Sequence, residues 1–147
     1  MVLALYFWGW VADRIGVKKP IIVAAAMLSA TIWALLTLME WRLGWEAMAL
    51  FILLGLSGGP VGVIFAATKE SVALENVGFA TALVNMGAFL TAALVQSGFG
   101  VILDITSSSE PRIVPSLQCY QTALILPLAI SAIGVVASLL LREDMSG

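Results

Sequence analysis

The sequence predicts an all-α fold, a polytopic bundle of membrane-spanning helices, from its composition and from the length of its uncharged stretches. Of the 147 residues, 61% are hydrophobic and 11% are charged, whereas an average soluble domain is about 25% charged. A soluble chain of this size could not bury so much apolar surface. We therefore expect an integral membrane protein with the lipid bilayer around it.

Four stretches without a charged side chain are long enough to cross a bilayer, which takes about 20 residues in a helix. Each is expected to be helical, because a backbone in lipid has no water to satisfy its polar groups. The predicted spans cover residues 20–39, 47–68, 77–103 and 118–141 of a single domain, 1–147.

The first eleven residues form a shorter apolar segment that ends in charge. At 1.5 Å per residue they cover roughly 16 Å, about half of a ~30 Å hydrocarbon core. Either the segment lies in the interface, or the chain lacks an upstream part. We expect the second, because a charged amino terminus at mid-membrane is costly.

A charged segment follows at residues 9–19, with the spacing G-x-x-x-D-R-x-G-x-K-K. Gly9 lets a helix end approach a neighbour closely, and Gly16 permits a tight turn. Asp13 can face the positive start of another helix, and Arg14 can form a forked bond to a carboxylate. The pair Lys18 and Lys19 can fix orientation and contact lipid phosphates. Without further information, this is a tight loop on the inner side of a membrane protein.

The same spacing resembles the signature loop of the major facilitator superfamily of transporters. In that family the motif lies between the second and third helices and again between the eighth and ninth. Four spans follow it here, so the resemblance implies the C-terminal six-helix repeat in part, from the end of helix eight through helix twelve. It also implies a missing N-terminal transporter half and a small solute as partners.

The resemblance further implies that the segment acts as a conformational latch. Asp13 and Arg14 would form a charge cluster with the acid at the end of a neighbouring helix, here Glu70. This cluster would stabilise one of the two access states of the transporter. The alternative is that Glu70 is a solvated acid paired with Lys69.

Polar residues inside the spans are candidates for a solute cavity. Asn85 is the first choice and Gln96 the second, and Thr81 lies four residues before Asn85 on the same helix face. Ser57 stands in a Gly- and Pro-rich stretch of the second span, where Pro60 predicts a kink. The alternative for these side chains is a hydrogen bond between helices without a role in solute binding.

The distribution of basic residues predicts the orientation. One side holds Arg14, Lys18, Lys19, Lys69 and Arg142, and the other holds Arg42 and Arg112. By the positive-inside rule the charged segment and the C-terminus are cytoplasmic. We expect the plasma membrane, in a bacterium the inner membrane.

Other function classes have little support in the sequence. No nucleophile–base pair, metal motif or phosphate loop appears, so we expect no enzyme and no cofactor or metal. The net charge of −2 gives no basic field for nucleic acid. The rival hypothesis is a small four-span protein that assembles into an oligomer or binds a partner, with the Gly-rich second span as its contact face.

Overall fold

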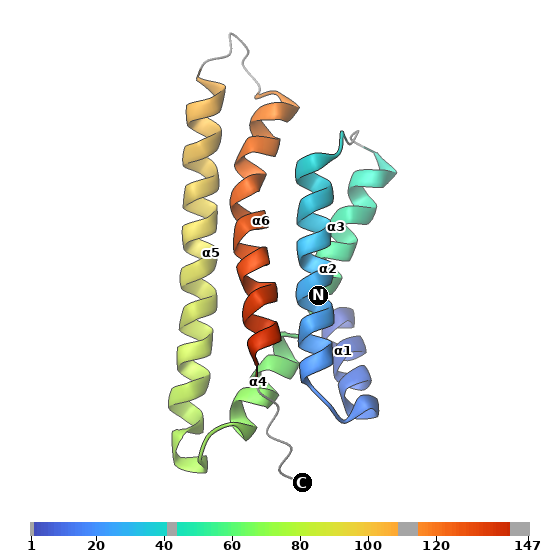
Figure 1. Ribbon diagram of the computed structural model, residues 1–147, viewed down its shortest axis with the longest axis vertical. Coiled ribbons are helices and arrows are strands. Elements are labelled where there is room, and N and C mark those ends of the chain that lie inside the picture. The colour runs from blue at the N-terminus through green and yellow to red at the C-terminus, as the bar shows by residue number, and fades with distance from the viewer. Residues whose placement is uncertain (1, 41–43, 109–114, 142–147) are drawn as a thin grey trace.

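The computed structural model describes residues 2–40, 44–108 and 115–141, which form helices joined by short connections (Figure 1). The elements are α1 (Val2–Ile15), α2 (Lys19–Leu38), α3 (Trp45–Ser57), α4 (Val61–Glu70), the 3₁₀ helix η1 (Leu74–Asn76), α5 (Val77–Ser107) and α6 (Leu117–Leu140). Within these described ranges there is no strand.

Four segments are long and apolar enough to cross a membrane: α2, α3 with α4, η1 with α5, and α6. The predicted all-α membrane bundle with four spans is therefore confirmed. Pro20 stands in the first turn of α2, where its missing N–H costs no hydrogen bond.

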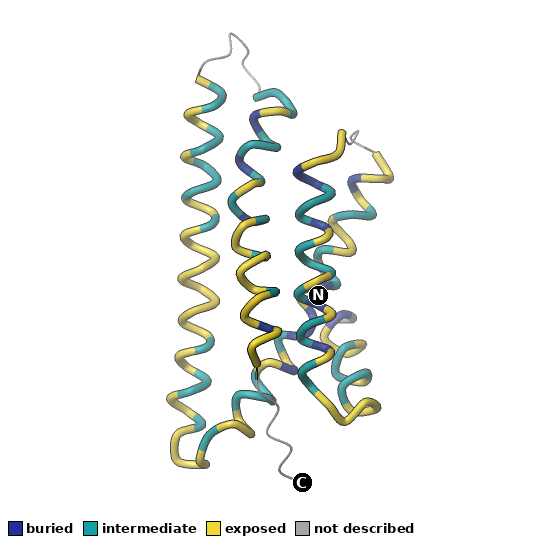
Figure 2. The backbone as a smooth tube through the Cα atoms, viewed as in Figure 1, coloured by how far each residue is buried: buried dark blue, intermediate teal, exposed yellow. Residues whose placement is uncertain are grey.

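The best-buried part of the bundle lies where α2 packs against α6 (Figure 2). Ile21, Ile32 and Leu36 of α2 are almost completely buried, and Ala123 of α6 has no exposed surface. Polar contacts tie the same two helices: the Thr37 hydroxyl donates to the carbonyl oxygen of Leu124 at 3.4 Å, and the Gln121 amide donates to that of Met39, the C-cap of α2, at 2.9 Å.

Helix α5 contrasts with this core. It has 31 residues, and none of them is buried, although it packs on α6 and α4. At 1.5 Å per residue it is roughly 46 Å long, more than a ~30 Å hydrocarbon core requires. Most of its surface therefore faces whatever surrounds the bundle.

The second span is interrupted near its middle. Helix α3 ends at Ser57 and α4 begins at Val61, within a segment that runs from Trp45 to Glu70. Pro60 cannot donate a backbone hydrogen bond, and the two preceding glycines accept the resulting change of direction. The kink expected at Pro60 is thus a full break between two helices.

Helix α1 corrects the expectation for the charged segment. We expected the helical part to end near Val11 and Asp13 and Arg14 to lie in a loop, but the helix continues to Ile15, so both residues are helical. The connection to α2 is confined to residues 16–18. The reason is that Ala12, Asp13 and Arg14 continue the helix without strain, and the first residue that ends it is Gly16.

Helix α1 crosses the second span at the break. A Cβ atom on Gly59 would lie 2.8 Å from the carbonyl carbon and oxygen of Ala4 and 2.5 Å from Cδ1 of Trp8. These are backbone atoms and a ring, which cannot turn aside as the end of a flexible side chain can. The contact therefore depends on the absence of a side chain at position 59.

This contact predicts that an alanine substitution destabilises the protein at Gly59 but not at Gly55. Gly59→Ala is expected to lower the free energy of unfolding by about 1–3 kcal/mol, the usual cost of overpacking. Gly55→Ala, whose Cβ would meet nothing within 4 Å, is expected to leave it unchanged or raise it by up to about 1 kcal/mol. Reversible unfolding in mixed micelles measures both, and equal effects would contradict the close crossing.

Candidate functional site

The candidate site begins at the turn between α1 and α2. Gly16 has a φ of +70°, a left-handed conformation that favours glycine. Its N–H donates to the carbonyl oxygen of Ala12 at 2.9 Å and so closes the last turn of α1. The turn then places Lys18 immediately before α2.

Lys18 forms an ion pair with Glu70, joining Nζ to Oε2. The first residue stands at the start of α2 and the second is the last residue of α4. The Lys18 side chain is 27% exposed and that of Glu70 is 69% exposed. Solvent therefore screens the pair, and its contribution to stability is expected to be small.

Among the described residues, the ion pair of Glu70 is with Lys18, another member of the signature segment, and none is found with Arg14 or Lys69. The role of this cluster as a latch stays a prediction. Because α1 remains helical through Ile15, Arg14 is carried to another face, where its guanidinium carbon lies 4.8 Å from the centre of the Trp10 ring. This is a cation–π contact at an exposed site.

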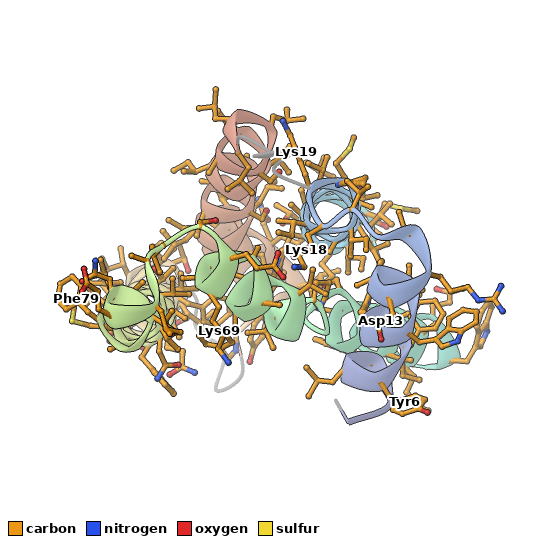
Figure 3. All side chains as sticks on the ribbon, turned by 90° about the horizontal axis from the view of Figure 1, so that it is seen from below. Tyr6, Asp13, Lys18, Lys19, Lys69 and Phe79 are labelled. Carbon is orange, nitrogen blue, oxygen red and sulfur yellow. The ribbon has the colours of Figure 1, made fainter. Side chains whose placement is uncertain are left out.

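Asp13 lines a hollow between α1 and α4 of about 350 Å³. Figure 3 looks onto this end of the bundle, with Asp13 on α1 and Lys18 pointing toward α4. Small residues form most of the walls of the hollow. The lining comprises Gly9, Ala12, Asp13, Gly16, Lys18, Gly62, Val63 and Ala66. Five members of the signature segment and one face of α4 therefore surround one space.

Lys19 and Lys69 lie at the same end of the molecule as Asp13 and Lys18 (Figure 3). Lys19 is the first residue of α2, and Lys69 is exposed near the end of α4. Of the other basic residues used for the orientation, Arg42, Arg112 and Arg142 lie outside the described residues. The described basic side chains of α1, α2 and α4 thus gather at one end.

The four residues predicted to line a solute cavity do not converge. Ser57 is buried and donates to the carbonyl oxygen of Leu54 at 2.7 Å, beside the break in the second span. The Thr81 hydroxyl oxygen is buried and has no hydrogen-bond partner among the described residues. Asn85 and Gln96 are exposed on α5.

Gln96 lines a second hollow, of about 490 Å³, that the sequence did not predict. Four helices contribute to it, and its lining comprises Trp33, Leu36, Phe51, Val95, Gln96, Phe99, Tyr120, Leu124 and Pro127. Apart from the Gln96 amide and the Tyr120 hydroxyl, the walls are apolar. No signal in a single sequence shows that these four helices would leave a space between them.

The comparisons with known proteins decide the family. The model of the Major Facilitator Superfamily matches residues 1–146. The chain belongs to the major facilitator superfamily. The resemblance seen in the signature segment is thereby confirmed over nearly the whole chain, and the protein is a membrane transporter of this general kind. The search of curated proteins and the search of solved structures each return no significant match.

The ion pair of this major facilitator protein can be tested by a double-mutant cycle. Lys18→Gln and Glu70→Gln are expected to show a coupling energy of about 0.2–1 kcal/mol in unfolding at low salt. The coupling should decline strongly in 1 M salt, where the screening length is about 3 Å. Glu75→Gln in η1 is the matched control. A coupling between Lys18 and Glu75 as large as that between Lys18 and Glu70 would contradict the pairing.

Proposed function

We propose that this chain works within a secondary transporter that moves a small solute by alternating access. Transporters of this kind rock two helix bundles around a site near the middle of the bilayer. The observation that carries the proposal is the ion pair between Lys18 and Glu70, which joins the signature segment to the end of the broken second span. We propose that the second bundle is an N-terminal half.

The ion pair is the latch in this proposal. It ties α2 to α4 at the end where the described basic residues gather, which by the positive-inside rule is the cytoplasmic end. Helix α6 ends at Leu140 toward this same end of the molecule (Figure 1), and we propose that the C-terminus of the chain is cytoplasmic too. Because the pair is exposed and weak, small changes elsewhere can break it. Asp13, in the hollow beside Lys18, keeps a second negative charge near this lysine.

The solute path is proposed to follow α5. This helix has no buried residue and yet carries Asn85 and Gln96 on its exposed surface. An amide that faces lipid is costly, so such groups usually face a bundle interior or a cavity. This supports a role of both amides at the surface between the two halves, with Thr81 on the same helix.

A test of the latch needs no known solute. Ala66→Cys places a thiol in the hollow, and its reaction with a membrane-impermeant maleimide reports access from the cytoplasmic side. Lys18→Gln is expected to raise the rate of labelling several-fold, because a free α4 end exposes the hollow. Lys69→Gln, next to Glu70 but outside the pair, is the control and should leave the rate unchanged.

Two outcomes would contradict the proposal. One is an equal labelling rate in Lys18→Gln, Lys69→Gln and the parent protein. The other is saturable uptake of a radiolabelled solute, from a panel of sugars, amino acids and organic anions, by vesicles that hold the 147-residue chain alone. That second result would overturn the need for two bundles.

A further inference from the structure

A hydrogen bond joins α1 to the break in the second span. The indole Nε1 of Trp8 donates to the carbonyl oxygen of Leu56 at 2.9 Å, although the two residues are 48 positions apart in the sequence. The ring is partly buried. Tryptophan has one donor and no acceptor, so this contact uses its full hydrogen-bonding capacity.

The accepting carbonyl is the one that Pro60 leaves without its helical donor. In an α-helix the N–H of residue 60 would bond to the carbonyl of residue 56, and proline has no N–H. The Gly59 N–H donates to the same oxygen at 3.1 Å. This bond spans three residues and so closes a tighter turn than the four-residue bond of an α-helix. A carbonyl oxygen has two lone pairs, and Trp8 supplies the second donor.

The same place is fixed by shape. Gly59 has no room for a Cβ atom because the Ala4 backbone and the Trp8 ring lie against it. Trp8 and Ala4 stand one helical turn apart on α1, so a single face of this helix makes both contacts. The break is thus held by one hydrogen bond and one backbone contact from the same face.

Helix α4 is therefore tied to α1 near its start and to Lys18 at its last residue, and it also packs against α5. Its start is held to α1 at Gly59, and its last residue, Glu70, is paired with Lys18 at the far side of the α1–α2 turn. Between the two ties lies the hollow, with Gly62, Val63 and Ala66 on the α4 side. Small side chains therefore line the hollow on the α1 side, at Gly9 and Ala12, as well as on the α4 side.

We propose that Trp8 is a positioning residue that makes the break at Gly59 a pivot for α4. Helix α4 has 10 residues, so it is about 15 Å long at 1.5 Å per residue. A swing of about 20°, the size of a sharp helix kink, would move its Glu70 end by about 5 Å while the start stays in place. Only the use of this swing in transport rests on the proposed latch, whereas the pivot itself rests on Trp8, Leu56 and Gly59.

Two pairs of spin labels separate pivot from latch in the 147-residue chain in lipid nanodiscs. Cysteines replace Ile15 and Lys69 to report the free end of α4, and Tyr6 and Leu53 to report the pivot, all in a Cys119→Ala background. Each position named for a label is exposed on its helix. Pulsed electron–electron double resonance then gives the distance distribution of each pair of spin labels.

Two results are expected. Lys18→Gln shifts part of the Ile15–Lys69 distance distribution by about 5 Å, the displacement expected for a helix of the length of α4 that swings by about 20°. The same substitution leaves the Tyr6–Leu53 distribution unchanged. Trp8→Phe broadens the Tyr6–Leu53 distribution, because a smaller aromatic ring is kept and the N–H donor is lost. Trp10 lies two residues further along the same helix and makes no hydrogen bond to the break among the described residues. Trp10→Phe is therefore the matched control and should change neither distance distribution.

The proposal is overturned if Trp8→Phe lowers thermal stability but leaves both distributions unchanged, since Trp8 would then be a packing residue. It is also overturned if Lys18→Gln moves both pairs equally. Benzothienylalanine at position 8 has the shape of tryptophan without the N–H, and it decides the question if Trp8→Phe does not fold. If Trp8→Phe broadens the Tyr6–Leu53 distribution but Lys18→Gln leaves the maleimide labelling of Ala66→Cys unchanged, the pivot is supported. Only the proposed latch is then contradicted.

Discussion

The rest of this structure depends on the need to satisfy the backbone of a broken helix inside a membrane. The second span breaks around Gly58–Pro60, near the middle of its 26 residues, where lipid offers no hydrogen-bond donor. The indole of Trp8 supplies a donor to Leu56, and Gly59 lets the backbone of α1 approach closely enough for that bond to form. The position of α1, and with it the signature segment, follows from this joint.

The charged end of the bundle works with smaller energies. An exposed ion pair such as Lys18–Glu70 contributes about 0–1 kcal/mol, and 1.4 kcal/mol corresponds to a tenfold change in an equilibrium constant. The pair can therefore bias two conformations by several-fold without locking either. This weakness suits the proposed latch, which would open in every transport cycle. The stronger constraint, the packed joint at Gly59, lies at the other end of α4, so α4 combines one firm attachment with one reversible attachment.

The sequence alone was sufficient for the spans, because charged residues are excluded from them and collect between them. It was also sufficient for the family, since Gly9, Asp13, Arg14, Gly16 and the two lysines stand at a specific spacing. It could not give the partner of Glu70, because that depends on where α1 ends: Arg14 remains helical and turns away, whereas Lys18 follows the turn at Gly16. The bond from Trp8 to Leu56 joins residues 48 positions apart, and a single sequence contains no trace of it. The contacts of Asn85 and Gln96 likewise depend on what covers α5.

The central claim is that Trp8 supplies the second donor, beside the Gly59 N–H, to the Leu56 carbonyl oxygen that Pro60 leaves without its helical donor. Isotope-edited infrared spectroscopy of the chain in lipid, with a ¹³C-labelled carbonyl at Leu56, observes that one group directly. We predict that Trp8→Phe moves the Leu56 carbonyl band to higher frequency, as loss of a hydrogen bond requires, and that Trp10→Phe leaves it in place. A Leu56 band that does not respond to the loss of the Trp8 indole would contradict the account.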